Sequence, residues 1–161
     1  MKKLFLVIAV ACVAAMSAGA QTVGYVDTEK ILSRISEYVN AQNELNTLAE
    51  KYKADIQKDV DAIDALYRSY QSQKSSLTTA QRESRENQII AKEKAVKEKE
   101  QKYFGEDGIL TKKSETLISP IQDVVEKAIT AVAEANNCSV VLDLTVVTGV
   151  VYKNPRFDLT Q

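Results

Sequence analysis

The stretch from Glu29 to Phe104 has the sequence EKILSRISEYVNAQNELNTLAEKYKADIQKDVDAIDALYRSYQSQKSSLTTAQRESRENQIIAKEKAVKEKEQKYF. It contains no proline, glycine or cysteine and is rich in Lys, Glu, Gln and Ala, which favour helix. In its first half, apolar residues recur at steps of three and four, which is the spacing of a heptad seam. They are Ile31, Ile35, Tyr38, Leu45, Ala49, Tyr52, Ile56, Ile63, Leu66 and Tyr70, with Gln42 and Asp59 as polar breaks. The pattern predicts a helix from Glu29 to about Tyr70 that needs a partner.

The partner is expected to be a second helix that returns along the first. The polar stretch from Ser69 to Thr79 predicts the tip of a hairpin, with Ser76 or Thr78 as the N-cap of the returning helix. The apolar stripe of that helix is thin, and it consists mainly of Ile89, Val96 and Tyr103. We therefore expect the half nearest the tip to bury little apolar surface and to be loosely held.

Strand-like segments flank this hairpin on both sides. Val23–Val26 precedes it, and Ser139–Leu144 and Val146–Tyr152 follow it. After a glycine-bounded break at residues 105–108, a third helix is expected over Ile109–Asn136, interrupted or kinked near Pro120. One small sheet must hold both ends of the hairpin. We predict an α+β fold with a small β-sheet body and a long inserted antiparallel helical hairpin.

The first twenty residues have the features of a cleaved secretory signal peptide. Two lysines precede an apolar run over Leu4–Ala15, and an Ala-Gly-Ala cleavage box follows at residues 18–20. We therefore predict three parts: a signal peptide at 1–20, a discontinuous β-rich body at 21–37 and 105–161, and a helical-hairpin tentacle at 38–104. No later segment reaches the roughly 20 apolar residues of a membrane span.

Charge and residue content argue against several function classes. Loss of the signal removes two lysines and no acids, which changes the formal net charge from −1 to −3 and disfavours nucleic-acid binding. The chain has no histidine, and after cleavage Cys138 is its single cysteine. The commonest metal ligands and the usual general base are therefore missing. We predict no enzymatic activity, no cofactor and no metal. Cys138 is expected to be a small buried hydrophobe, with a redox role as the alternative.

Three carboxylates were candidates for acid–base chemistry. Asp27, Asp143 and Asp158 each have a structural explanation as a helix cap, a strand end or a turn residue. Three short strands also make a poor isolated core, because small sheets usually need a partner surface. We therefore expect the body to be an oligomerisation domain.

Six short motifs occur along the mature chain in a characteristic order. They are VGYVDTEKIL at 23–32, GILTKK at 108–113, LISPI at 117–121, VLD at 141–143, VY at 151–152 and DLT at 158–160. Together they resemble the OmpH/Skp family of periplasmic outer-membrane-protein chaperones. The resemblance implies a jellyfish-shaped homotrimer, in which three β-domains form a body and three hairpins surround a cavity.

What the resemblance implies for function is an ATP-independent holdase. It would bind unfolded outer-membrane β-barrel proteins between its tentacles in the periplasm and prevent their aggregation. Strongly basic members of this family attract anionic lipid, whereas this chain is mildly acidic, so a weak membrane or lipopolysaccharide contact stays open. The alternative is a periplasmic coiled-coil structural or adaptor protein that binds one defined partner.

Three sets of residues are candidates for these roles. The apolar client contacts of the hairpin are predicted to be Leu45, Tyr52, Ile56, Ile63, Leu66, Tyr67, Tyr70 and Leu77. Cationic contacts near the tip are predicted to be Arg68, Lys74, Arg82 and Arg85. The trimer body is predicted to use Val23, Tyr25, Val140, Leu142, Val150 and Tyr152. Among the tyrosines, Tyr67 lies off the seam and is expected to be exposed.

Overall fold

The computed structural model describes residues 22–161, so the predicted signal peptide lies outside the described residues. The described elements are β1 (Thr22–Val26), α2 (Thr28–Leu32), α3 (Ser36–Gln73), α4 (Thr79–Phe104), α5 (Ile109–Ala135), β2 (Cys138–Asp143) and the 3₁₀ helix η1 (Pro155–Phe157). A long helical hairpin is thus inserted between the two strands of a small sheet, and the predicted α+β fold class is confirmed.

The described chain forms two compact units. We call residues 22–34 and 124–161 the strand unit, and residues 35–123 the hairpin unit. The first part of α5 therefore groups with the hairpin, whereas the predicted domain limits placed residues 105–123 with the β-rich body. The functional division into body and tentacle stays a prediction.

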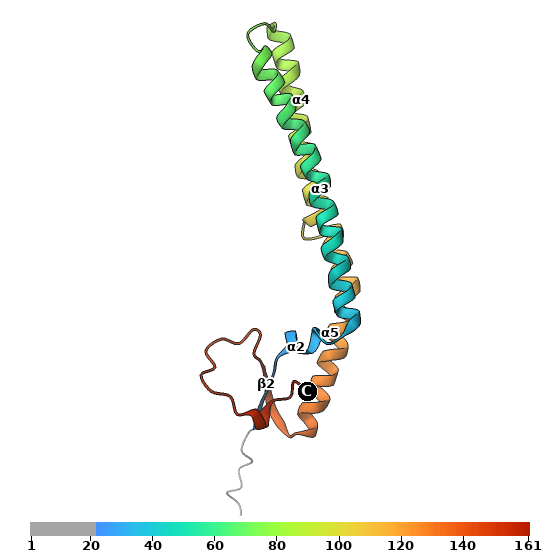
Figure 1. Ribbon diagram of the computed structural model, residues 1–161, viewed down its shortest axis with the longest axis vertical. Helices are drawn as coiled ribbons and strands as arrows, with labels where there is room; N and C mark the ends of the chain where they lie inside the picture. The colour runs from blue at the N-terminus through green and yellow to red at the C-terminus, as the bar shows by residue number, and fades with distance from the viewer. Residues whose placement is uncertain (1–21) are drawn as a thin grey trace, which may run out of the picture. The chain divides into compact units, whose positions relative to one another are not determined.

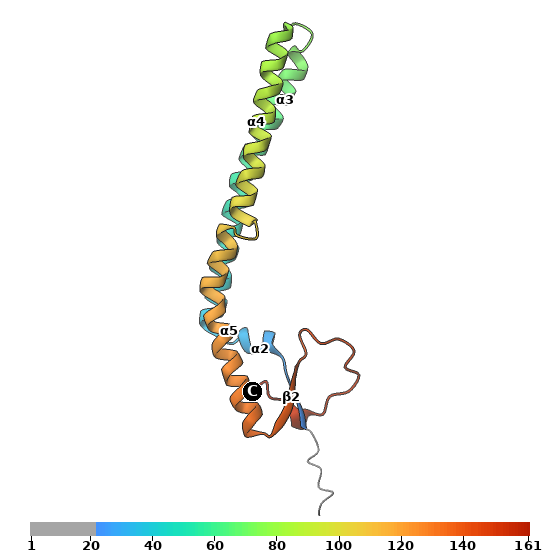
Figure 2. The ribbon, with the colours of Figure 1, turned by 180° about the vertical axis from the view of Figure 1, so that it is seen from behind.

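Within the hairpin unit, α3 and α4 run side by side in opposite directions (Figures 1 and 2). The tip lies between Gln73 and Thr79, as predicted. Thr78 begins α4 with a capping box: its hydroxyl accepts the Gln81 N–H at 3.4 Å, and the Gln81 side-chain oxygen accepts the Thr78 N–H at 2.9 Å. The sequence had left this cap open between Ser76 and Thr78.

The predicted single helix from Glu29 to Tyr70 is wrong at its start. The chain forms the short helix α2 and then breaks at Ser33–Ile35, so that α3 begins only at Ser36. The Ser33 hydroxyl donates to the Lys30 carbonyl at 3.0 Å, and Ile35 has an extended backbone. Serine side chains compete with helical hydrogen bonds in this way. Ile31 therefore precedes the hairpin and does not belong to its seam.

The break between α4 and α5 depends on two glycines. A Cβ on Gly105 would lie 2.4 Å from the Gln101 carbonyl oxygen, and a Cβ on Gly108 would lie 2.8 Å from the Gly105 backbone. Side chains are therefore excluded at both positions. Beyond this loop, α5 continues through Pro120 without interruption, and it is followed by Asn137 in the left-handed conformation (φ 53°).

In the strand unit, β1 lies between two neighbours. It pairs in parallel with β2, so that Val23 lies opposite Val140 and Tyr25 opposite Leu142. On its other side, Tyr25 forms a parallel bridge with Asp158, and the Leu159 N–H donates to the Tyr25 carbonyl at 2.8 Å. The segment after η1 thus acts as a third, very short strand.

The predicted strand at Val146–Tyr152 is wrong. This segment lies in a turn and an irregular loop, where Gly149 adopts a positive φ of 88°. The strand-forming side chains are unpaired: Val151 is 99% exposed and Tyr152 is 78% exposed. Both edges of β1 are already occupied, by β2 and by the segment at Asp158. This loop therefore finds no strand edge within its own chain with which to pair, despite its high β propensity.

The sequence Asp-Leu-Thr occurs at 143–145 and at 158–160, and both copies hold the end of β1. In each copy the threonine N–H donates to the aspartate Oδ1 at 3.0 Å. The Thr28 hydroxyl donates to Asp143 Oδ2 at 2.6 Å, and the Asp27 N–H donates to Thr160 Oγ1 at 3.1 Å. Hydrogen bonds to both Asp-Leu-Thr segments therefore hold Asp27 and Thr28, where β1 ends and α2 begins.

Gly24 provides the closest packing in the strand unit. A methyl group on Gly24 would lie 2.8 Å from Leu159 Cδ1 and 3.1 Å from Cys138 Sγ. We expect Gly24→Ala to lower the free energy of unfolding of the strand unit by about 1–3 kcal/mol, the usual cost of overpacking. Urea denaturation measures the loss of global stability, and amide hydrogen exchange of β1 and β2 measures the loss in the strand unit.

A double-mutant cycle with Leu159→Ala tests the cause. If the methyl group acts by contact with Leu159, the second substitution removes the clash and the two losses are less than additive. Fully additive losses would contradict this explanation.

Candidate functional site

The middle of the hairpin is joined by stacked rings and partly buried ion pairs. The rings of Tyr52 on α3 and Tyr103 on α4 stack with centroids 4.0 Å apart and planes 8° apart. Beside them, the Lys99 ammonium lies 3.0 Å from Asp55 Oδ2 and 2.5 Å from Asp59 Oδ2. The Tyr103 hydroxyl donates to Asp55 Oδ2 at 2.9 Å. We call these five residues the mid-hairpin cluster, and they bond α3 to α4 through both polar and aromatic contacts.

Hydrogen bonding changes the pKa values within this cluster. Hydrogen bonds from Lys99 and then from Tyr103 lower the pKa of Asp55. Hydrogen bonds to Asp59 and Asp55 raise the pKa of Lys99, and the bond to Asp55 raises the pKa of Tyr103. Asp55 therefore stays ionised, and Lys99 and Tyr103 stay protonated, across the neutral range.

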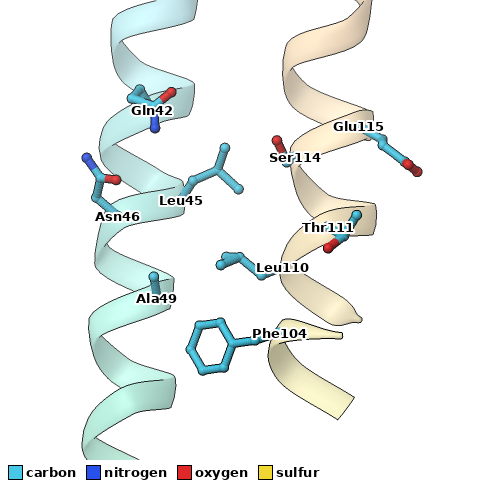
Figure 3. Close-up of a pocket in the computed structure, with 9 residues that line it drawn as sticks. All are labelled: Gln42, Leu45, Asn46, Ala49, Phe104, Leu110, Thr111, Ser114 and Glu115. Carbon is cyan, nitrogen blue, oxygen red and sulfur yellow. The ribbon is translucent and has the colours of Figure 1, made fainter. Parts of the chain in front are cut away.

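A groove lies on one side of this cluster, between α3 and the chain around the glycine loop. It has a volume of about 370 Å³. Figure 3 shows the side chains of Leu45, Leu110 and Phe104 directed into the space between the two backbones. The lining residues are Gln42, Leu45, Asn46, Ala49, Phe104, Leu110, Thr111, Ser114 and Glu115. We call it the Phe104 groove; it has an apolar floor and a mostly neutral polar rim.

A second groove lies on the other side of the cluster, further toward the tip. Its volume is about 440 Å³, and it is lined by Val60, Ile63, Asp64, Glu93, Val96, Lys97 and Glu100. We call it the Val96 groove. Its floor is aliphatic and its rim is charged. The thin apolar seam of the hairpin therefore leaves two open grooves on either side of one well-bonded contact.

The predicted client-contact residues fall into three groups in the structure. Leu45 and Ile63 line the grooves; Ile63 is half-buried, whereas Leu45 is buried at the floor of the Phe104 groove. Tyr67 is 52% exposed, as expected from its position off the seam, and Leu66 and Leu77 are half-buried. The remaining three, Tyr52, Ile56 and Tyr70, pack between the helices: Ile56 and Tyr70 are buried, and Tyr52 is stacked in the mid-hairpin cluster.

Near the tip, several charged side chains contact other groups of the same hairpin. The Tyr70 hydroxyl donates a short hydrogen bond to the Glu86 carboxylate, which raises the pKa of Tyr70. The Lys74 ammonium lies 5.5 Å from the centroid of the Tyr70 ring, and the Arg82 Nε–H donates to the Leu77 carbonyl at 3.1 Å. Of the four predicted cationic contacts, Arg68 and Arg85 are exposed and enter no hydrogen bond or ion pair within the described chain.

The predicted trimer-body residues lie on the two strands and on the loop that follows β2. All except Val140 line a cavity of about 200 Å³ between the sheet and the loop before η1. Val23 and Val140 are 46% and 49% exposed and lie opposite each other in register. Tyr25 is buried within its own chain, with the Lys153 ammonium 5.2 Å from its ring centroid.

The three candidate acid–base carboxylates serve structural roles. Asp27 caps α2 by accepting the Lys30 N–H at 2.9 Å. Partial burial alone would raise the pKa of Asp143, but hydrogen bonds from Thr28 and Thr145 outweigh it and lower the pKa. Hydrogen bonds from Thr160 likewise lower the pKa of Asp158. Residues 22–161 contain no group of three His, Cys, Asp or Glu placed to hold a metal ion.

Several groove residues were missed by the sequence patterns. Val60 lies one position from the polar break at Asp59, so it stood outside the heptad seam. Phe104 and Leu110 lie on either side of the glycine loop, and only the structure places both beside α3. Val96 belongs to the thin apolar stripe of α4, and this stripe is the sequence signal for the Val96 groove. Cys138 is half-buried and forms no disulfide, and its thiol lies 3.9 Å from the Asn136 carbonyl oxygen.

Comparison with known proteins gives one family and one fold. The sequence profile of the family described as outer membrane protein (OmpH-like) matches residues 22–161. A crystal structure of a candidate OmpH-like outer membrane chaperone from Caulobacter crescentus is similar, with a TM-score of 0.59 and 19% sequence identity, over 88% of this chain and 80% of that chain. At this identity the likeness concerns the fold. No curated protein sequence matches the chain.

Among the described helices, none is long and apolar enough to cross a membrane.

The mid-hairpin cluster should give the hairpin a stability that depends on pH. Because the folded pKa of Asp55 is lowered, its contribution is present above about pH 4 and is lost as the pH falls through the folded value. Because the pKa values of Lys99 and Tyr103 are raised, their contributions are present below about pH 10 and are lost as the pH rises through the folded values. We expect Lys99→Met to lower the temperature of helix unfolding at pH 7 and to flatten the acid limb, as measured by circular dichroism from pH 2.5 to 11.

Lys53→Met is the matched control. Lys53 forms an exposed ion pair with Glu50 one turn away on the same helix, at 2.9 Å. Such pairs contribute little. An equal effect of both substitutions would show that Lys99 acts as an ordinary surface charge.

Proposed function

Because the chain belongs to the OmpH-like family of outer membrane proteins, we propose that it is a holdase chaperone for unfolded outer-membrane β-barrel proteins. It acts without ATP, without a cofactor and without catalysis. The observation that carries this proposal is the pair of open grooves with apolar floors on either side of the mid-hairpin cluster. Such a surface suits a protein that must hold many different apolar segments.

The grooves support weak and adaptable binding. Each offers only a few aliphatic or aromatic side chains, so one groove gains little free energy from a bound segment. Several hairpins that bind one unfolded chain at the same time raise the overall affinity without any strong single site. Release then requires no energy source, because each contact dissociates easily when the client folds elsewhere.

A homotrimer would supply these several hairpins. The strand unit has two strands and one bridged segment, which is too small a sheet for an independent core. It also leaves apolar side chains exposed, among them Val23, Val140, Val151 and Tyr152. We propose that further copies of the chain cover this surface. The signal-like first twenty residues support export to the periplasm, where unfolded outer-membrane proteins pass.

An aggregation assay tests this function. Unfolded β-barrel protein is diluted from urea with increasing amounts of the mature chain, and light scattering is followed. We expect the wild type to suppress aggregation at a small molar excess of trimer over client. The double variant Ile63→Ser and Leu110→Ser, with one change in each groove, should need about tenfold more protein, since each lost apolar contact weakens every hairpin in the assembly.

Ile90→Ser is the matched control. Ile90 is 59% exposed on α4 and lines neither groove, so its loss should leave the suppression near wild type. If the double variant suppresses aggregation as well as the wild type, the grooves are not the binding surface. If the wild type binds one folded partner stoichiometrically and no unfolded barrel, the chain is an adaptor coiled coil.

A further inference from the structure

The Val96 groove has a floor and a rim of different chemistry. Val60 and Ile63 are one turn apart on α3, and Val96 lies on α4, so aliphatic side chains from both helices form the floor. Val96 is buried, whereas Val60 and Ile63 are half-buried and retain accessible surface. Val60 and Ile63 therefore offer apolar contact surface to an aliphatic side chain of a bound segment.

The rim carries an excess of negative charge. Asp64, Glu93 and Glu100 contribute three carboxylates, and Lys97 contributes the single ammonium group. Within residues 22–161, none of these four side chains forms a hydrogen bond or an ion pair with another residue. By contrast, the neighbouring Lys99 is bonded to two aspartates in the mid-hairpin cluster. The rim carboxylates are thus available to an external cation.

The carboxylates lie at both ends of the floor. Tyr52 lies against Tyr103 and Asp59 against Lys99, so the antiparallel pairing places Asp64 near Glu93 at the tip side. Glu100 lies seven residues further along α4, which corresponds to about 10 Å of helix. An occupant would therefore meet negative charge before and after its apolar contact.

The Phe104 groove has a different rim. Its polar residues are amides and hydroxyls, apart from Glu115. Both grooves offer an apolar floor, but only the Val96 groove adds several unpaired carboxylates. The two grooves of one hairpin should therefore differ in the segments that they select.

We infer that the Val96 groove binds extended segments of unfolded proteins in which an aliphatic residue has Lys or Arg two positions before and two positions after it. In an extended chain these three side chains lie on one face, and the outer two are about 13 Å apart. Flexible lysine or arginine side chains cover the small difference from the spacing of the carboxylates. This inference rests on the proposed function and specifies the segments that it selects.

Matched peptides test the preference. The probe is a fluorescein-labelled peptide with three Lys-Ser-Leu-Ser-Lys units joined by Gly-Ser linkers, and its counterpart has Glu in place of every Lys. Fluorescence anisotropy with the mature chain is recorded at 20 mM and 500 mM NaCl. We expect the Lys peptide to bind at least about tenfold more tightly than the Glu peptide at low salt, and the difference to shrink at high salt because exposed charges are screened.

Two triple variants separate the groove from general charge. The groove variant is Asp64→Asn, Glu93→Gln and Glu100→Gln; the control variant is Glu83→Gln, Asp123→Asn and Glu126→Gln, at exposed positions outside the groove. Both change the net charge equally. At roughly the usual strength of exposed pairs, the groove variant should bind the Lys peptide about five- to tenfold more weakly, and the control less than twofold. Val60→Thr, which keeps the shape of the floor, should also weaken binding of this peptide.

The outcomes distinguish the two proposals. If the wild type suppresses aggregation of an unfolded barrel but binds both peptides equally, this inference is overturned and the proposed function stands. Equal weakening by the groove and control variants would also overturn it, because general electrostatic attraction would then explain the preference. If the wild type does not suppress aggregation, the proposed function fails, whatever the peptides show.

Discussion

The bonded contact between α3 and α4 at the mid-hairpin cluster is the constraint on which the hairpin depends. The helix α3 has 38 residues and is about 57 Å long, and most of the stability of a helix in a protein comes from packing of its apolar face. The apolar seam supplies this packing unevenly, and a stacked tyrosine pair with a lysine between two aspartates reinforces its middle. The partly buried ammonium group of Lys99 is paired with two carboxylates, so its charge is compensated within the hairpin. The two open grooves lie in the seam on either side of this contact.

The strand unit is stabilised by a small number of local hydrogen bonds. Its central strand is tied at its end by two copies of Asp-Leu-Thr, one after β2 and one after η1. These hydrogen bonds fix β1 and the start of α2, while the loop at residues 145–154 keeps its strand-forming side chains exposed. Local hydrogen bonds thus stabilise a very small sheet, and its apolar surface remains for contact with other chains, as proposed above.

The hairpin could be predicted from sequence because its signals are local. A long run without proline or glycine, a polar tip and the capping residue Thr78 each act within a few residues. The break at Ser33 was missed, because one serine hydroxyl that competes for a backbone carbonyl leaves no periodic signal. The strand predicted at Val146–Tyr152 was wrong for a different reason: its propensity is real, but a strand needs an edge, and both edges of β1 are taken by segments distant in the sequence. The grooves were only partly predictable, since Phe104 and Leu110 become neighbours of Leu45 through tertiary packing.

The central claim is that the hairpin holds unfolded segments in the grooves beside a cluster that stays closed. The most direct measurement is amide hydrogen exchange of the hairpin with and without an unfolded β-barrel protein bound. We predict added protection in the segments 45–49, 60–64 and 93–97, which contain groove-lining residues, and little change at Tyr52 and Asp55 in the cluster. Protection confined to the strand unit, or loss of protection throughout the cluster on binding, would contradict this account.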